Sequence, residues 1–376
     1  MKTFLVATIS NSLDFFDGAI EFFSKDNDLC AISSNEDGLK SFGEKKSIRT
    51  IYVPMERRIS PFKDLKSLWH MWRVMRHEKP DMVHSMTPKA GMISMVSAWL
   101  ARVPIRIHTF TGLVFPTSTG LKRRILMFTD WLTCACATHI IPEGEGVKAD
   151  LLNNNITKKP IRVLGHGNVI GIDLEHFKPE ESNPPISKNG HPPFTFVFVG
   201  RLVGDKGINE LVTAFSKLNK EHSATRLVLV GPQDKKLDPV KPETVAEIEQ
   251  NPAIDAVGRQ NDVRPFYSSA DALVFPSYRE GFPNVVIEAG AMGLPSIVTD
   301  INGSREIIID GENGIIVPSK DSEALYQAMK HFVENPEDVK RMAENARPLI
   351  ASRYEQSYVR QCLKDFYKEV IAQRGL

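Results

Sequence analysis

The stretch "FVFVGRLVGDKGINELVTAF", residues 196–215, joins an apolar run to a helical pattern through a glycine-rich loop. The run that ends at Gly200 predicts a buried strand, and the helix is expected to begin at about Ile208. Free N–H groups and the dipole at a helix N-terminus attract anions. Arg201 adds a planar guanidinium group with several hydrogen-bond donors, and Lys206 adds a compact ammonium charge. Together they make this turn a candidate diphosphate site without a metal. The alternative is a pair of solvated loop charges, because glycine-rich strand–helix turns are common.

Short β-branched runs alternate with longer helical segments along the rest of the chain. Strands are predicted at 3–9, 28–33, 49–54, 81–86, 106–110, 138–142 and 161–164, and again at 194–200, 226–231, 254–258, 272–276, 296–300 and 314–318. Predicted helices include 62–78, 88–102, 120–137 and the helical stretch 320–375. Such alternation indicates parallel sheets with helices on both faces. The predicted fold class is α/β, with two doubly wound, Rossmann-like domains facing across a cleft at the carboxyl ends of their strands.

The boundary between the domains is predicted from a change in composition. The segment "HFKPEESNPPISKNGHPPF", residues 176–194, has five prolines and no aliphatic run. It predicts a linker at 181–193 between an N-terminal domain, 1–180, and a C-terminal domain, 194–354. The last helix, 355–376, is expected to pack back on the N-terminal domain.

Composition excludes several classes of protein. The 376 residues have a formal net charge of +1, with 42% hydrophobic and 25% charged residues, which is ordinary for a globular chain and argues against nucleic-acid binding. The four cysteines, Cys30, Cys134, Cys136 and Cys362, lack zinc-ligand spacing and are expected to be reduced thiols of a cytoplasmic protein. The apolar run 92–101 is about half of the ~20 residues that a membrane-spanning helix needs.

A second stretch, "SYREGFPNVVIEAGAMGLPS" at 277–296, places Glu280 and Glu288 eight positions apart. Pro283 fits the first position of a helix, so Glu280 is expected in the preceding loop and Glu288 in the second helical turn. Glu288 interrupts an otherwise apolar helix, where a carboxylate is costly to bury without partners. Two such acids near Arg201 and Lys206 favour a functional site over a first-turn acid and a solvated helix charge.

Three motifs of the second half, "GRLVGDKG", "VGRQNDV" and "EGFPNVVIEAGAMGLPSIVTDINGSREIIIDGENGIIV", together resemble the C-terminal domain of the retaining glycosyltransferases of family 4, which have the GT-B fold. The resemblance is strong over 195–335. It is looser in "VHSMTPKAGMISMVSAWLARVPIRIHTFTG" and "VLGHGNVIGIDLEHF". Those stretches are similar to the branch that acts on lipid-linked or surface polysaccharide intermediates.

The resemblance implies a role for each matching residue. Arg201 and Lys206 would hold the donor diphosphate and stabilise the leaving group, and Glu280, the first acid of an E-x7-E motif, would bind donor-sugar hydroxyls. Glu288, the second acid, would accept hydrogen bonds from the ribose. The other implied donor-binding positions are Gly200, Gly258, Arg259, Gly281, Phe282, Asn284 and Val285. The two acids would therefore serve opposite ends of one nucleotide sugar.

The acceptor side is expected in the N-terminal domain. Many relatives have a histidine where this chain has Thr111, whose hydroxyl cannot become cationic, and paired glycines where this chain has Ser-Asn-Ser at 10–12. The predicted acceptor-side residues are Asn11, Ser12, His84, Lys89, His108 and Thr111. His84, Thr87 and Lys89 are expected to face the cleft, with Lys89 meeting an acceptor phosphate. The alternative is a packed strand histidine and an ordinary helix-start lysine.

The reaction that the resemblance implies is sugar transfer with retention of configuration from a nucleotide sugar, with UDP-hexose or UDP-N-acetylhexosamine expected. The acceptor would be a saccharide or polyprenyl-diphosphate-linked saccharide in capsule, O-antigen or other surface polysaccharide synthesis. No cofactor and no metal are expected, and 26–28, Asp-Asn-Asp, is predicted to be a surface turn rather than a metal motif. Two rival functions stay open: a GT-B nucleotide-sugar epimerase, and a non-catalytic nucleotide-sugar-binding subunit of a polysaccharide assembly complex.

Basic residues interleaved with tryptophan suggest a peripheral membrane contact. The segment 55–79 has Arg57, Arg58, Lys63, Lys66, Arg73, Arg76 and Lys79 around Trp69 and Trp72, and 121–128 adds Lys122, Arg123 and Arg124. A basic amphipathic face with tryptophan suits an anionic membrane surface. The alternative is a surface helix that packs its tryptophans and leucines into the N-terminal domain.

Overall fold

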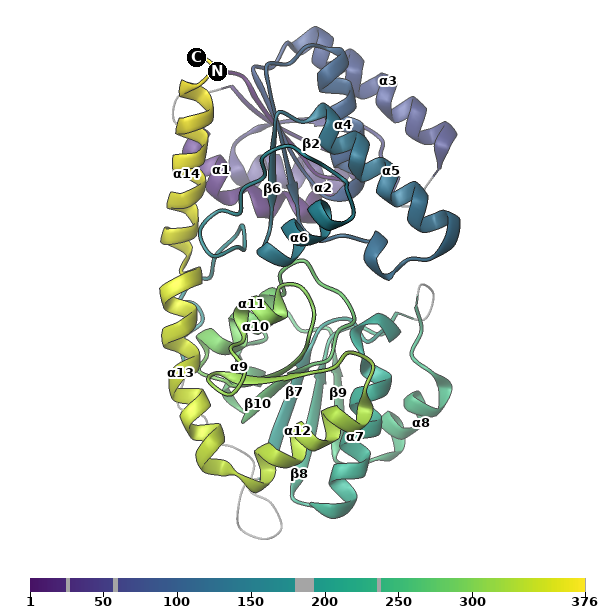
Figure 1. Cartoon of the computed structure of the whole chain (residues 1–376), viewed down its shortest axis with the longest axis vertical. Helices are drawn as coiled ribbons and strands as arrows, with labels where there is room; N and C mark the ends of the chain where they lie inside the picture. Colours follow the sequence, from purple (N-terminus) through teal and green to yellow (C-terminus); the bar gives the residue numbers. More distant parts are fainter. Residues whose placement is uncertain (25–27, 57–59, 180–192, 235–237, 376) are drawn as a thin grey trace. The chain divides into compact units, whose positions relative to one another are not determined.

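The computed structural model describes residues 1–24, 28–56, 60–179, 193–234 and 238–375. The chain divides into two compact units, here called the N-terminal unit (Met1–Gly171 with Gln356–Leu376) and the C-terminal unit (Ile172–Glu355). Figure 1 gives the element labels used below. The predicted linker, apart from its last residue, lies outside the described residues, as do Asp26, Asn27, Arg57 and Arg58.

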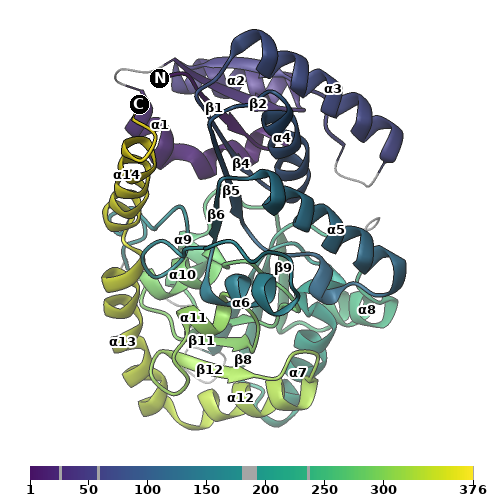
Figure 2. The same ribbon diagram turned by 45° about the horizontal axis from the view of Figure 1, so that its top comes forward.

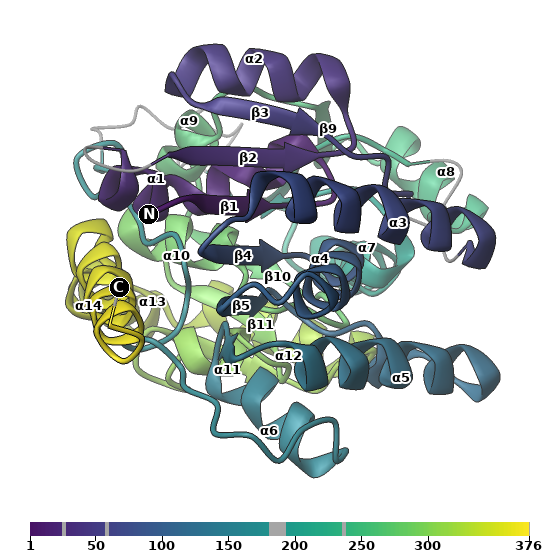
Figure 3. The same ribbon diagram turned by 90° about the horizontal axis from the view of Figure 1, so that it is seen from above.

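The N-terminal unit contains a six-stranded parallel sheet in the order β3-β2-β1-β4-β5-β6. Its strands are β1 Thr3–Val6, β2 Leu29–Ser33, β3 Arg49–Tyr52, β4 Met82–Met86, β5 Ile105–Phe110 and β6 His139–Pro142. Its helices are η1 Ser10–Phe16, α1 Asp17–Phe23, α2 Glu36–Lys46, α3 Pro61–Glu78, α4 Pro88–Leu100, η2 Phe115–Thr117, α5 Gly120–Cys136, α6 Glu145–Asn153 and the C-terminal α14 Gln356–Ala372. Figure 3 shows β3, β2, β1, β4 and β5 in this order, seen from above.

Alternating side chains along each buried strand build two separate cores on the two faces of this sheet. Phe4 and Val6 of β1 pack with residues of α3, α4 and α5, whereas Leu5 of the same strand packs with α1, α2 and α14. Tyr367 of α14 is buried in the second core, where its hydroxyl lies 2.6 Å from His84 Nδ1 of β4. The last helix is therefore an integral layer of the N-terminal unit.

The C-terminal unit has the same topology, with the strand order β12-β11-β10-β7-β8-β9. Its strands are β7 Phe194–Val199, β8 Thr225–Val230, β9 Ile254–Gly258, β10 Ala272–Phe275, β11 Ser296–Thr299 and β12 Gly314–Val317. Its helices are η3 Gly204–Lys206, α7 Ile208–Glu221, α8 Pro242–Gln250, α9 Arg264–Ser268, α10 Asn284–Ala291, α11 Ser304–Ile307, α12 Ser322–Glu334 and α13 Pro336–Tyr354. Helices α7 and α12 pack against each other beside the sheet (Figure 2).

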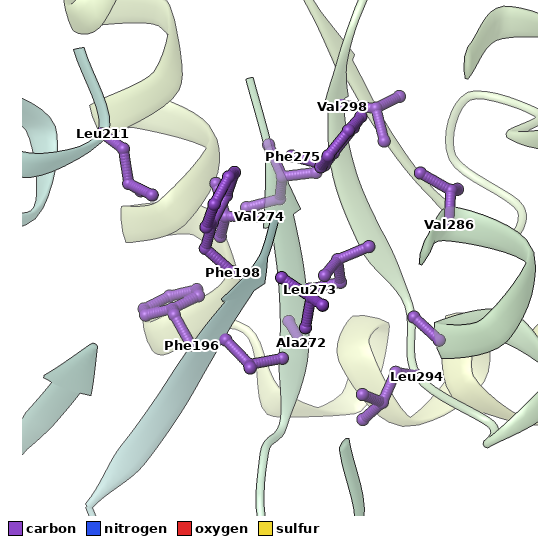
Figure 4. Close-up of a cluster of buried hydrophobic side chains, with 14 of the residues drawn as sticks. Phe196, Phe198, Leu211, Ala272, Leu273, Val274, Phe275, Val286, Leu294 and Val298 are labelled. Carbon is purple, nitrogen blue, oxygen red and sulfur yellow. The ribbon is translucent and has the colours of Figure 1, made fainter. Parts of the chain in front are cut away.

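The core of the C-terminal unit is centred on its two middle strands. Phe196 and Phe198 of β7 lie beside Leu273 and Phe275 of β10, and the rings of Phe198 and Phe275 stack with centroids 6.0 Å apart (Figure 4). Helix α7 contributes apolar side chains at i, i+3, i+4 and i+7 spacing, namely Ile208, Leu211, Val212 and Phe215. This packing fixes the carboxyl ends of β7 and β10 beside each other.

Most predicted elements are present, and one predicted strand is wrong. Residues 161–164 form no strand; a long backbone hydrogen bond of 3.5 Å joins Arg162 N to Ile140 O of β6. Pro160 has no N–H to donate, which weakens a ladder at this edge of the sheet. Within the described residues, no helix combines the length and apolarity needed to span a bilayer.

Candidate active site

The candidate site lies in the C-terminal unit where the strand order reverses. The first and fourth strands of this sheet, β7 and β10, are neighbours, and the chain leaves them toward opposite sides of the sheet. Ligands of doubly wound sheets bind outside the carboxyl ends of the strands at such a point. The loop 200–207 follows β7 and the loop 276–283 follows β10, so these two loops form the floor of the candidate site.

Glycine at position 207 allows the two loops to touch. Gly207 has φ of +71°, and a Cβ atom there would lie 2.1 Å from the carbonyl oxygen of Pro276. A side chain at this position would therefore both strain the backbone and separate the loops. The 3-10 turn Gly204–Lys206 precedes this residue and presents the Lys206 side chain toward the second loop.

The central contact of the site is an ion pair between Lys206 of the first loop and Glu280 of the second. Each of the two side chains is 18% exposed. The Ser277 hydroxyl donates a 2.7 Å hydrogen bond to Glu280 Oε1, and Lys206 Nζ lies 5.3 Å from the ring centroid of Phe275. Thr299 of β11 donates to the Ser277 carbonyl, so three neighbouring strands hold the glutamate in place.

A second set of contacts joins the same two loops. Arg279 donates a 2.9 Å hydrogen bond to Asp205 Oδ2, and Tyr278 N donates to the Asp205 carbonyl at 2.8 Å. Asp238 accepts from Asp205 N at 2.5 Å through its carboxylate and from Gly204 N at 3.0 Å through its carbonyl. The turn that carries Lys206 is thus fixed from both sides.

Arg201 sits apart from this ion pair. Its side chain is 51% exposed, and its Nη1 atom lies 3.7 Å from Asp234 Oδ2. At that exposure such a pair contributes little, so the guanidinium can turn to another anion. The structure brings Lys206 and Glu280 together but shows no contact of either with Arg201 among the described residues.

Glu288 lies in the second turn of α10, as predicted, and Pro283 lies at the N-cap position, one residue before the predicted first helical position. The Tyr267 hydroxyl of α9 donates a 3.0 Å hydrogen bond to Glu288 Oε2. Burial raises the pKa of Glu288, and the hydrogen bond from Tyr267 opposes that rise. Sequence reasoning did not find Tyr267, because the residue is 21 positions away and carries no motif that links it to Glu288.

The remaining donor-side positions surround these groups. Phe282 is 6% exposed and packs its ring on Tyr354, with centroids 5.4 Å apart, so only its backbone is available to a ligand. Asn284 and Val285 are the first two residues of α10. A Cβ at Gly303 would lie 2.5 Å from the Gly281 carbonyl, so the loop after β11 closes tightly over this turn.

Three further predicted positions lie at the ends of strands β7 and β9. Gly200 follows β7 and has a φ of +152°. A Cβ atom at Gly231 would lie 1.8 Å from the carbonyl oxygen of Gly200. Gly258 ends the outer strand β9 with φ of +69°, and Arg259 after it is exposed. Gly258 and Arg259 are therefore at the same sheet edge as the ion pair, two strands further out.

Two predicted acceptor-side histidines are buried in the N-terminal unit. His84 lies between the hydroxyls of Tyr367 and Thr109, at 2.6 and 2.8 Å, and His108 Nδ1 lies 2.8 Å from Ser85 Oγ. Burial lowers the pKa of each histidine to about 3. The expectation that the His84 side chain faces the cleft is wrong, because it is 0% exposed.

The other acceptor-side candidates are more accessible. Lys89 forms a 2.6 Å ion pair with Asp64, and both side chains are 11% exposed. Asn11 is exposed and Ser12 half-buried in η1, whereas Thr111 is half-buried just after β5. The structure adds Thr8, whose hydroxyl lies 2.7 Å from that of the predicted Thr87, between the ends of β1 and β4.

Two sheets of the order 3-2-1-4-5-6 give two Rossmann-like units, which is the architecture of the GT-B class. Residues 179–348 match the family model "Glycosyl transferases group 1", and residues 30–167 match "Glycosyl transferase 4-like domain". The chain is 32% identical over 372 residues to the capsular polysaccharide biosynthesis glycosyltransferase CapM of Staphylococcus aureus, covering 97% of this chain and 96% of CapM. The chain therefore belongs to glycosyltransferase family 4 and is a glycosyltransferase.

Other relatives and structures agree with this assignment. An Escherichia coli UDP-Gal:alpha-D-GlcNAc-diphosphoundecaprenol alpha-1,3-galactosyltransferase is 26% identical over 340 residues, covering 87% of this chain and 86% of that one. The crystal structure of Anabaena HepE with UDP has a TM-score of 0.78 at 17% identity, over 98% of this chain and 100% of that chain, and shows the fold alone. Among the described residues, no group of three or more His, Cys, Asp or Glu is arranged to hold a metal ion.

Proposed function

We propose that this glycosyltransferase moves a sugar from a UDP-hexose or UDP-N-acetylhexosamine to a polyprenyl-diphosphate-linked saccharide, in the synthesis of a capsule or another surface polysaccharide. The observation that carries the proposal is the Lys206–Glu280 pair, fixed between the two loops at the switch point of the C-terminal sheet. The names of the relatives support it, because they include a capsule enzyme and an enzyme for a diphosphoundecaprenol-linked acceptor.

The ion pair supplies both kinds of group that a sugar diphosphate requires. On donor binding, Lys206 would turn to the diphosphate, and Glu280 would accept hydrogen bonds from the sugar hydroxyls. The guanidinium group of the exposed Arg201 would donate hydrogen bonds to the phosphates, and the start of α10 would add backbone N–H groups. Glu288, oriented by Tyr267, would accept hydrogen bonds from the ribose. In the free protein each side chain of the ion pair neutralises the charge of the other, and both are held in position for the donor.

The proposed chemistry breaks the bond between the anomeric carbon and the diphosphate oxygen. The acceptor hydroxyl attacks from the same face, and its proton passes to the leaving phosphate, so the configuration is retained. Lys206 and Arg201 would stabilise the negative charge that develops on the leaving group, as preorganised cations do in other transferases. No metal is required in this scheme, because these two cations and a helix N-terminus face the diphosphate.

A transfer assay tests the proposal. The full chain is incubated with a panel of UDP-sugars and a polyprenyl-diphosphate-linked saccharide, and the product linkage is assigned by NMR. We expect one donor to be transferred with its anomeric configuration retained, in EDTA as well as in Mg²⁺. Inversion, or strict loss of transfer in EDTA, would contradict the proposed mechanism.

Two matched variants and two control reactions sharpen this assay. Glu280→Gln should lower the rate of transfer by about 10- to 150-fold. Glu323→Gln, which breaks the surface ion pair with Lys217 in the same unit, should leave the rate unchanged. Conversion of the UDP-sugar without acceptor would indicate an epimerase, a possibility raised because a UDP-N-acetylglucosamine 2-epimerase structure has a TM-score of 0.64. Donor binding without any turnover would indicate a non-catalytic subunit.

The proposed place of action is the cytoplasmic side of the cell membrane. A polyprenyl-linked acceptor remains in the bilayer, so the enzyme has to work at the membrane surface. Peripheral attachment would bring the enzyme to that surface.

A further inference from the structure

Helices α3, α4 and α5 lie side by side on one face of the N-terminal sheet, with α4 in the middle (Figure 3). Their inner sides supply core residues such as Met71, Met75, Ile93, Ala98 and Cys134. Their other sides form one surface layer, which we call the α3–α5 face. Its large apolar residues are Phe62, Leu65 and Trp69 of α3, Trp99 and Leu100 of α4, and Leu121, Phe128 and Trp131 of α5.

These apolar side chains are unusually exposed. Phe62 is 91% exposed, Leu121 72% and Leu65 68%. Of the eleven large hydrophobic side chains that are exposed in the described part of the chain, eight belong to this face. Scattered single residues need no explanation, but a concentration of this kind on one layer indicates an interaction surface.

The charges on these helices have one sign wherever they are exposed. The exposed cations are Lys66, Arg73 and Arg76 of α3, Lys79 just after α3, Arg102 just after α4, and Lys122 and Arg124 of α5, and Lys63 pairs with Glu56. The three helices contain three acids. Asp64 pairs with Lys89, Asp130 is 6% exposed, and Glu78 is paired with Lys2 and Arg49. No exposed carboxylate on these helices offsets the cations.

We propose that the α3–α5 face docks on the surface of an anionic lipid bilayer, with its aromatic and leucine side chains inserted among the headgroups and its cations on the lipid phosphates. Tryptophan and phenylalanine beside lysine and arginine are the side chains that anchor proteins at this interface. A protein partner would have to place an anion at each of seven separate points, whereas an anionic bilayer presents anions over its whole surface. The inference rests on the proposed function, since that function has a lipid-linked acceptor.

Vesicle sedimentation of the full chain tests this surface. The probes are vesicles of phosphatidylcholine alone and of phosphatidylcholine mixed with phosphatidylglycerol. We expect sedimentation with the mixed vesicles that falls as salt rises, and weaker sedimentation with the neutral ones. Equal sedimentation with both, or none with either, would overturn the proposal.

Paired variants locate the contact. Phe62→Ser with Leu121→Ser should weaken partitioning by about 10-fold or more, and Lys66→Glu with Arg124→Glu by a similar factor. The matched controls remove exposed apolar residues elsewhere, Leu152→Ser with Tyr358→Ser, or exposed lysines elsewhere, Lys40→Glu with Lys340→Glu, and should partition like the wild type. Equal losses in the controls would overturn the assignment of this face.

Two further readouts separate this inference from the proposed function and from a protein interface. Transfer to a water-soluble saccharide acceptor should be unchanged in the face variants, because none of these residues belongs to the donor site. Transfer without vesicle binding would remove the membrane inference alone, and vesicle binding without transfer would remove the proposed function alone. If the wild type is a dimer in solution and the apolar variant a monomer, the face is a protein interface and the proposal fails.

Discussion

Lys206 and Glu280 come from loops 74 positions apart in the chain and form an ion pair at the carboxyl edge of the C-terminal sheet. The Ser277 hydroxyl donates to the same carboxylate, at 2.7 Å. A half-buried pair of this kind holds both side chains in one geometry before a ligand arrives. If a donor replaces each partner with a phosphate or a sugar hydroxyl, little reorganisation is required, and preorganised charge is effective in catalysis.

Substitution of either partner of this ion pair should reduce transfer. We expect Glu280→Gln and Lys206→Ala each to lower kcat/KM by about 10- to 150-fold, the range for loss of one charge-assisted contact of ~1.5–3 kcal/mol. The double variant should lose less than the product of the two single losses, because each single change leaves the other charge unpaired. Steady-state kinetics measures all three, and strictly multiplicative losses would show that the two residues act independently.

Tyr267 should act on nucleotide binding through Glu288. Tyr267→Phe removes the 3.0 Å hydrogen bond to Glu288 Oε2, and UDP affinity should fall by ~3- to 10-fold. That hydrogen bond lowers the Glu288 pKa, so the variant should lose UDP affinity at a higher pH than the wild type as the solution is acidified. Isothermal titration calorimetry across pH measures both effects.

A modified nucleotide distinguishes this role from general damage to the fold. The 2′,3′-dideoxy form of UDP lacks the hydroxyls that Glu288 would bind, so wild type and Tyr267→Phe should bind it alike. If the variant loses the same affinity for both nucleotides, Tyr267 has a structural role only.

Gly207→Ala should damage the site through the backbone. The residue has φ of +71°, and the new Cβ would lie 2.1 Å from the Pro276 carbonyl oxygen, so the two loops must separate. We expect a lower melting temperature and loss of UDP binding. Gly311→Ala is the control, because it has φ of +77° with no atom within 4 Å of its Cβ position, and should cost stability without affecting UDP. Normal UDP binding by Gly207→Ala would contradict the described contact between the loops.

Asp130 should make stability depend on pH. Burial in α5 raises the pKa of Asp130 to about 7, above the ~3.9 of an unfolded chain. The folded state therefore binds more protons between about pH 4 and pH 7, and its stability falls as pH rises through that range. Asp130→Asn should be more stable than wild type at pH 8 by up to ~4 kcal/mol, and by much less at pH 4.5. Urea unfolding measures this difference, and Asp365→Asn, an exposed acid on α14, should show no such pattern.

The sequence predicted features that depend on local order along the chain. The strand, loop and helix around Lys206, and the positions of Glu280 before α10 and Glu288 in its second turn, follow from apolar runs, glycines and a proline within about twenty residues. The α/β class and the family were predicted from the same patterns and are confirmed. Parallel strands bring the loops that follow them to the same edge of the sheet, and local motifs were therefore sufficient to predict where these residues lie.

Features that depend on tertiary contacts were not predictable. Tyr267, the partner of Glu288, and Thr299, the partner of the Ser277 carbonyl, carry no motif, and their roles depend on how α9 and β11 pack against the segment after β10. His84 resembled a cleft residue because it lies near the end of a strand, yet the core beneath α14 buries it against Tyr367. A hydrophobic run at 161–164 predicted a strand, but pairing at a sheet edge with Pro160 could not be judged from the run alone.

The central claim is that the two loops after β7 and β10 bind the diphosphate of a nucleotide sugar. Thermal unfolding of the wild type and of Lys206→Ala, with UDP, GDP or ADP, tests it most directly. A ligand at 100 times its dissociation constant should add ~2.7 kcal/mol of stability. We predict that UDP raises the melting temperature of the wild type and that the shift is lost in Lys206→Ala. An equal shift in both proteins, or no shift with any nucleotide, would contradict the account.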